Sequence, residues 1–361
     1  MRRLVALLFP LAFGGCYLLK QAGGQIDILL HSRDVEEMLA DPSVPPATKE
    51  KLRLVRDIKE FGEREMGLTP SANYTTFYDT VGRPVTFIVT ACAKDSFRPY
   101  TWWFPIVGDV PYKGFFNRDD AVAEARALRA EGYDVSLGSA AAYSTLGYFK
   151  DPVLSTMLDI PAEHLAALIL HELTHGTIFL PGGADFNEGL ASFVGWQGAL
   201  EFARRSRGTG SAEYDRTVEA FAQEQQRDAR ALGLFASLDR LYRSSVPRET
   251  KLAERERIFA AFVAQRRAEA EGARDALHRR RGSEEERAAE AARVRQLEAA
   301  VPDGPVNNAA VLNQRRYGRY ETFRERFDRA GGDWRAFFLG LRREPVTPGP
   351  SPSADSAPSP P

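Results

Sequence analysis

Residues 161–194 read PAEHLAALILHELTHGTIFLPGGADFNEGLASFV. Apolar side chains recur at helical spacing from Leu165 to Leu173, and Pro161 suits a first turn, so the first part of this stretch predicts a helix. Pro181-Gly182-Gly183 ends that helix and lets the chain reverse. A second helix is expected from Asn187. The stretch therefore predicts two antiparallel helices joined by a tight turn.

Two histidines lie four residues apart on the first predicted helix. This step advances about 40° around the axis and about 6 Å along it, so His171 and His175 can both reach one Zn²⁺ at about 2.0–2.1 Å. Glu172 lies about 100° round the helix from His171 and cannot easily bind the same ion, but it can reach a water bound to the ion. The pattern therefore predicts a zinc site in which Glu172 is the catalytic general base.

A catalytic zinc site needs a third protein ligand and leaves its fourth position to water. Because the turn reverses the chain, Glu188 on the second helix can project onto the same ion. Asp185 is the rival third ligand, but it lies closer to the turn, where we expect it to accept a hydrogen bond from a ligand histidine. Two alternatives stay open, namely a metal-free helix with two surface histidines and a structural or inactive zinc site.

The composition of the 361 residues narrows the class of protein. Lys and Arg number 48 against 49 Asp and Glu, which gives a net charge of −1. Because these charges are interspersed, they are typical of solvated helix faces, and no nucleic-acid partner is expected. Only two cysteines are present, so a disulfide-rich scaffold is excluded. One of them, Cys92, falls in a predicted strand over Val85–Ala93, where we expect a buried, inert thiol.

The N-terminus has the layout of a secretory signal. Arg2 and Arg3 precede an apolar run that is too short to span a bilayer, and Gly14-Gly15-Cys16 follows. This ending resembles a bacterial lipobox, which predicts a lipoprotein signal peptide over residues 1–15 and a lipid on Cys16. We therefore expect a membrane anchor in the bacterial cell envelope, facing the periplasm, and Tyr17 after the cysteine favours the outer membrane over the inner one. An ordinary cleaved signal and an N-terminal anchor helix are the alternatives.

The amino-acid composition changes several times along the chain after the signal. Aromatic and β-branched runs between residues 73 and 117 predict a small sheet beside the helices, so the expected fold class is α+β. The expected segments are an N-terminal helical segment 16–72, an α+β core 73–205 with the zinc site, a charged helical region 206–305, a C-terminal helical segment 306–344 that packs on the core, and a disordered Pro/Ser-rich tail 345–361.

The zinc motif with Asn187-Glu188-Gly189-Leu190-Ala191 resembles the gluzincin peptidases, especially their aminopeptidase branch. More closely, the chain resembles the bacterial predicted aminopeptidase lipoprotein family over nearly all of its length except the tail. The motifs that carry this second resemblance are Gly15-Cys16-Tyr17, Trp102 to Phe116, Ala142 to Gly147, and Asn307-Asn308-Ala309 with Tyr317. The resemblance implies a gluzincin-like core, a small sheet with an active-site helix and a glutamate helix, to which further long helices are added.

The resemblance also implies one Zn²⁺ per chain and a peptide substrate. The acidic residue with which that branch holds a substrate amine has no clear match in residues 137–143. The resemblance implies an aminopeptidase as the expected activity, and the missing match leaves two alternatives open, a zinc endopeptidase and a cell-envelope scaffold with a vestigial zinc site. Tyr143 and Tyr317 are candidate donors to the oxyanion or contacts to the substrate, with packing as the alternative for each. Trp102-Trp103-Phe104 is expected in the core rather than in a substrate cleft.

Overall fold

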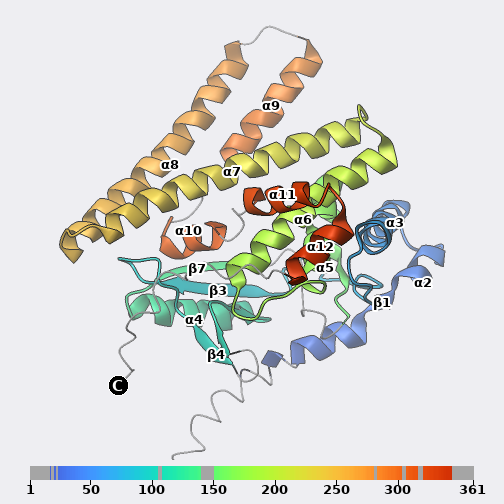
Figure 1. Ribbon diagram of the computed structural model, residues 1–361, viewed down its shortest axis with the longest axis horizontal. Helices are drawn as coiled ribbons and strands as arrows, with labels where there is room; N and C mark the ends of the chain where they lie inside the picture. The colour runs from blue at the N-terminus through green and yellow to red at the C-terminus, as the bar shows by residue number, and fades with distance from the viewer. Residues whose placement is uncertain are drawn as a thin grey trace, which may run out of the picture.

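The computed structural model describes residues 17, 20–21, 23–104, 108–139, 150–279, 283–302, 306–315 and 320–343. Over these residues the chain is mostly helical with small sheets, so the predicted α+β class is confirmed (Figure 1). Cys16, Tyr143, Tyr317 and the tail 345–361 lie outside the described residues. The predicted division of the chain into segments stays a prediction.

Helices α5 (Ala162–His175) and α6 (Ala184–Arg207) lie at the centre of the molecule, and the predicted helix pair is confirmed. Helix α5 is apolar around most of its circumference because it packs between α6, α3 (Pro46–Phe61) and α7 (Ala212–Arg243). The connection between α5 and α6 turns at Gly182, whose φ of 75° favours glycine.

The main hydrophobic core surrounds this helix pair. It unites side chains from α2 (Val35–Ala40) and α3, from α5 and α6, and from α11 (Tyr320–Arg329) and α12 (Trp334–Arg343). Phe193 of α6 is fully buried at its centre, where the rings of Tyr320, Phe327 and Phe337 have centroids 5.1, 5.7 and 5.5 Å from its own. Helices that are far apart in the sequence therefore hold the central pair from two sides.

An antiparallel sheet in the order β6-β3-β7 lies beside the helices. Its strands are β6 (Lys113–Phe115), β3 (Phe87–Cys92) and β7 (Asp134–Ser139). Helix α4 (Arg118–Ala130) covers one face and α10 (Asn308–Arg315) the other (Figure 1). The strand predicted around Cys92 is confirmed, and this thiol is buried, as expected, with its Sγ–H donating to the carbonyl of Ser96 at 3.4 Å.

A smaller sheet in the order β1-β2-β8 comprises β1 (Arg33–Asp34), β2 (Thr76–Tyr78) and β8 (Val153–Leu154). Strand β1 pairs with β2 and ends directly before α2 begins. Asp34 is the N-cap of α2 and accepts hydrogen bonds from the backbone N–H groups of Glu36 and Glu37, so the chain is extended just before that helix begins.

A third sheet in the described residues is the hairpin of β4 (Trp102–Phe104) and β5 (Gly108–Val110). Trp102 is buried, and its Nε1–H donates to Glu124 at 2.7 Å. Trp103 is 70% exposed, so its predicted core position is wrong. The reason is the two-residue period of a strand, which sends neighbouring side chains to opposite faces.

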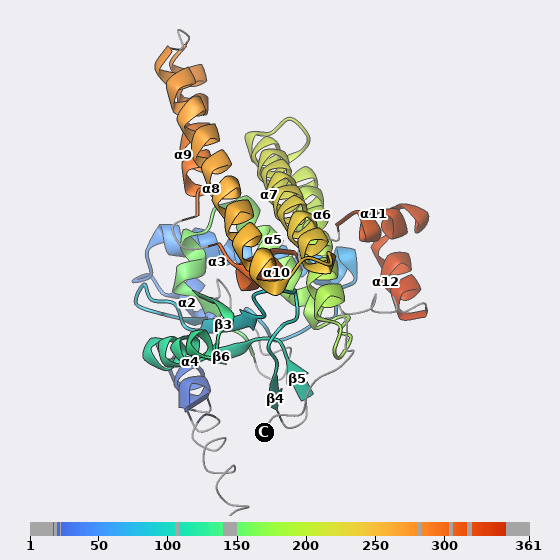
Figure 2. The same ribbon diagram turned by 90° about the vertical axis from the view of Figure 1, so that its left-hand side faces the viewer.

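The charged region after α6 forms α7, α8 (Arg248–Arg279) and α9 (Glu284–Ala299), which confirms the expected long helices. Helices α8 and α9 make a hairpin that extends away from the body of the molecule (Figures 1 and 2). A buried ion pair ties α8 to the sheet, since Arg255 lies 2.7 Å from the Asp134 carboxylate of β7. Within the described ranges, no helix combines the length and the apolar character that a membrane crossing requires.

Candidate metal centre

Helix α5 presents His171 and His175 one turn apart. The side chain of His175 is only 7% exposed and that of His171 is half-buried. Their Nε2 atoms lie 3.3 Å apart, with the ring planes at 83° to each other. The four-residue spacing therefore does what helix geometry predicts and directs both ring nitrogens to one point.

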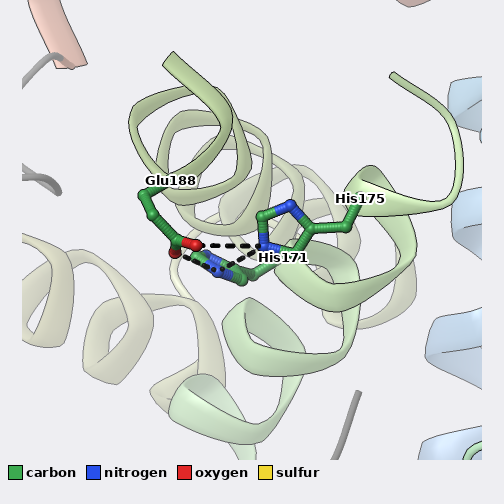
Figure 3. Close-up of side chains that lie close together, drawn as sticks. All are labelled: His171, His175 and Glu188. Atoms are coloured by element: carbon green, nitrogen blue, oxygen red, sulfur yellow. Dashed lines mark hydrogen bonds and ion pairs between the residues drawn. The ribbon is translucent and has the colours of Figure 1, made fainter. Parts of the chain in front are cut away.

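Helix α6 brings Glu188 to the same point. Its carboxylate oxygens lie 3.4 Å from Nε2 of His171 and 3.8 Å from Nε2 of His175 (Figure 3). Among the described residues, these three side chains form the group whose ligand atoms lie close enough, within 4.8 Å of one another, to hold a metal ion. Two imidazoles and a carboxylate thus converge from two helices.

Asn187 explains how α6 is aligned for this role. Its side-chain amide is buried and bonds twice to Leu180, accepting from the backbone N–H at 2.8 Å and donating to the carbonyl at 2.9 Å. These bonds fasten the connection after α5 to the first turn of α6. Because Glu188 is the next residue, the same clamp fixes the direction in which its carboxylate leaves the helix.

The electrostatics of the group suit a cation. Burial and the neighbouring His171 lower the pKa of His175 to about 4, against the opposing charge of Glu188, so His175 is neutral at pH 7 and offers a lone pair. Burial also acts to lower the pKa of His171, but the hydrogen bond to Glu188 and the charges of Glu172 and Glu188 raise it above its ordinary value. A positive charge between these atoms would satisfy the carboxylate and both ring nitrogens together, so the donor set fits a metal ion.

Glu172 lies on α5 beside His171 and is half-buried. Its charge acts on His171 and also on Tyr74, whose pKa is raised well above its ordinary value by burial first and then by Glu172 and Asp151. Tyr74 is a residue that the sequence does not mark as part of the site. It is buried with a φ of 60°, a backbone conformation that residues with a Cβ seldom adopt. The assignment of Glu172 as general base stays a prediction.

Asp185 lies one turn before Glu188 on α6, and its carboxylate is 3.6 Å from Arg315 at the end of α10. The Nδ1 atom of His175 is buried and has no hydrogen-bond partner among the described residues, so Asp185 does not serve as the acceptor for this histidine. Its predicted role toward His171 stays a prediction. Arg315 is a second residue that the sequence does not single out, because α10 reaches the site only through tertiary packing.

Two further histidines of the chain lie outside the metal group. The ring of His164 packs against Trp196 at 5.4 Å, and His31 pairs with Asp27 at 3.0 Å. Neither histidine belongs to the group of His171, His175 and Glu188. Tyr143 and Tyr317 lie outside the described residues, so their suggested contacts with the oxyanion or the substrate stay predictions.

Comparison with known proteins supplies one match. A family model described as "Putative aminopeptidase" matches residues 16–344, a range that includes the metal group and both candidate tyrosines. No match was found among curated proteins or among solved structures.

Proposed function

The chain belongs to the family described as putative aminopeptidases, and on that premise we propose that it is a zinc-dependent aminopeptidase with a gluzincin-like core. The observation that supports this proposal is the convergence of His171, His175 and Glu188 at one point. Two imidazoles and one carboxylate are a donor set that suits zinc and leaves a coordination position for water. The substrate in this proposal is a peptide.

Different residues carry out metal binding and proton transfer in the proposed reaction. His171, His175 and Glu188 hold the metal ion, which when bound supplies Lewis acidity to the scissile carbonyl and to a water. Glu172 lies next to His171 and takes a proton from that water as general base. The same carboxyl group then donates the proton to the leaving amine. Because Glu172 is half-buried, its carboxylate acts in a medium that screens it less than bulk water.

The two glutamates give the sharpest test of this division. Glu172→Gln should retain zinc near one per chain and lose activity by about 10²- to 10⁴-fold, because it removes only proton transfer. Glu188→Ala should lose zinc first and activity as a consequence. Zinc is measured by mass spectrometry after dialysis, alongside hydrolysis of a mixed peptide set by the same preparations.

A third variant separates the two candidate third ligands. Asp185→Asn should keep zinc at one per chain and change affinity or activity by about 10- to 100-fold at most. Loss of zinc in Asp185→Asn with retention in Glu188→Ala would make Asp185 the ligand. Full activity in Glu172→Gln would remove the proposed base, and zinc binding without hydrolysis of any peptide would favour the scaffold over the enzyme.

Peptides with blocked ends decide between an aminopeptidase and an endopeptidase. An aminopeptidase needs the free amine, so acetylation of the N-terminus should abolish cleavage while amidation of a long peptide's C-terminus should not. Cleavage of acetylated peptides at internal bonds would show an endopeptidase. Loss of cleavage in the presence of a chelator, with recovery on addition of Zn²⁺, should accompany the activity in either case.

We also propose that the chain is a lipoprotein of the bacterial cell envelope, anchored through Cys16 to the outer rather than the inner membrane and facing the periplasm. The support is the basic start, the short apolar run and the Gly-Gly-Cys ending of the signal. Cys16→Ser should release the protein from the membrane fraction or leave the signal uncleaved. Unchanged processing and membrane retention would contradict the anchor.

A further inference from the structure

Arg315 lies at the end of α10 and brings a positive charge to Asp185, one helical turn before the metal-group residue Glu188. One guanidinium nitrogen lies 3.6 Å from the Asp185 carboxylate. The guanidinium also lies over the ring of Phe235 on α7, 4.3 Å from its centroid, and the side chain is only 21% exposed. Three elements, α6, α7 and α10, therefore fix where this arginine lies.

The contact with Asp185 does not supply hydrogen-bond acceptors for all the N–H groups of the Arg315 guanidinium. A separation of 3.6 Å is an ion pair but is too long for a hydrogen bond. The Nη1 atom of Arg315 is buried and has no hydrogen-bond partner within the part of the chain that the structure describes. A buried N–H of a charged group is costly when unpaired, so an acceptor that approaches the guanidinium through its exposed part would relieve this cost.

The position of Arg315 relative to the metal ligands indicates which ligand this is. Asp185 and Glu188 are three residues apart on α6, so their Cβ atoms are about 5–6 Å apart on neighbouring positions of the helix surface. The guanidinium consequently lies on the order of 10 Å from the metal group. An extended peptide covers about 3.3–3.6 Å per residue, so two or three residues of a substrate span this distance.

We propose that Arg315 binds a carboxylate of the peptide substrate and makes the enzyme selective for peptides that carry one near the scissile bond. This inference rests on the proposed peptidase function. The planar fork of a guanidinium matches a carboxylate and can form two parallel hydrogen bonds with it. The carboxylate has two possible sources, the C-terminus of a dipeptide or tripeptide and an Asp or Glu side chain close to the cleaved bond.

Two pairs of peptides distinguish these sources. One pair shares a tripeptide sequence and ends in a free carboxylate or an amide, and the other is a longer amidated peptide with Glu or Gln after the cleaved bond. The wild-type enzyme should prefer the carboxylate member of at least one pair by about 10-fold or more in kcat/KM, since hydrogen bonds to charged groups contribute about 1.5–3 kcal/mol. The pair that shows the preference identifies the source.

Arg315→Gln should remove this preference by raising KM for the carboxylate peptide, and kcat/KM for the uncharged member should stay within about twofold of wild type. Arg243→Gln is the matched control, because Arg243 is an exposed arginine of α7 whose ion pair is with Asp239. The control should keep the full preference. An equal loss for charged and uncharged peptides in Arg315→Gln would assign Arg315 a structural role on Asp185 and overturn the proposal.

A binding measurement separates this inference from the proposed function. Zinc-loaded Glu172→Gln protein is titrated by calorimetry with both pairs of peptides, with and without Arg315→Gln. Tighter binding of the carboxylate member of either pair that disappears with Arg315→Gln supports the carboxylate site even if no peptide is hydrolysed. Equal binding of the two members in both pairs, or no binding of any of the peptides, overturns it. If Arg315→Gln fails to fold, Arg315→Lys keeps the charge but loses the fork, and it should weaken the preference by several-fold.

Discussion

A β-carbon on Gly195 of α6 would lie 2.5 Å from the carbonyl oxygen of Ala167 on α5. It would also lie 3.2 Å from Cβ of the metal-group residue His171. The two helices thus cross at a point where only a hydrogen atom fits. The separation of the helix that carries the histidines from the helix that carries Glu188 is set by this glycine.

Gly195→Ala should therefore push α5 and α6 apart. Overpacking of this kind costs about 1–3 kcal/mol, and the displaced Glu188 should weaken zinc binding even in the folded fraction. Gly233→Ala on α7 is the control, because a Cβ there meets nothing within 4 Å and alanine favours a helix by about 1 kcal/mol. Urea denaturation and zinc titration check both variants, and an unchanged zinc affinity in folded Gly195→Ala would contradict the spacing role.

The aromatic cluster around Phe193 should be among the most sensitive parts of the core. Phe193→Ala removes a fully buried ring that contacts α11 and α12, so a loss of about 3–5 kcal/mol is expected. Phe179 is an exposed phenylalanine in the α5–α6 connection, and Phe179→Ala should cost far less. Calorimetric melting compares the two. Similar melting temperatures would show that α11 and α12 contribute little to the core.

Replacing only Arg255 in its buried ion pair with Asp134 should lower the stability of the fold more than replacing both residues. Asp134 also accepts from the backbone N–H of Asn308, and Arg255 also donates to the carbonyl of Lys94. Arg255→Met leaves a buried carboxylate without its cation, at a cost of about 3–5 kcal/mol. Adding Asp134→Asn should recover part of that loss, since the amide oxygen still accepts from Asn308. Denaturant unfolding of Arg255→Met, of Asp134→Asn and of the double variant tests this, and additive losses would contradict it.

Asp228 on α7 should make stability depend on pH. Burial, followed by the charge of Glu224, raises its pKa to about 6, although the hydrogen bond from Gln314 opposes the rise. A raised pKa in the folded state means that ionisation favours unfolding. This penalty is absent below about pH 4, grows as the pH rises to about 6, and is complete above that.

Asp228→Asn should therefore stabilise the protein at pH 7 by about 1 kcal/mol, after allowance for solvent screening of this partly exposed group, and should have little effect at pH 4. The asparagine oxygen can still accept from Gln314, so the hydrogen bond is kept. Melting temperatures of the wild type and the variant from pH 4 to pH 8 give the difference directly. A difference that is constant with pH would contradict the raised pKa.

The parts of the site that the sequence predicts are those that depend on local geometry. His171 and His175 share one helix, so their four-residue spacing determines that they converge. Glu188 follows from a short turn that can only return the chain beside α5. The α+β class follows in the same way from local patterns, since apolar spacing marks α5 and aromatic runs mark the strands.

The parts that the sequence does not predict depend on contacts between distant segments. Arg315 reaches Asp185 because α10 docks on the sheet and on α7, and no local pattern encodes that docking. Besides burial, the charge of Glu172 helps to raise the pKa of Tyr74, which lies in a loop almost a hundred positions earlier in the sequence. The exposure of Trp103 depends on which face of a two-stranded hairpin meets α4, and three aromatic residues in a row leave that choice open.

Aromatic side chains of α11 and α12 pack over Phe193 of α6, and this packing also determines when the site can form during folding. Synthesis and export both deliver the chain from its N-terminus, so α5 and α6 arrive with the metal group complete in sequence but with the ring of Phe193 still uncovered. We expect the helix pair to remain loosely packed until α11 and α12 have followed, so that a functional site forms only after the chain has been delivered as far as α12.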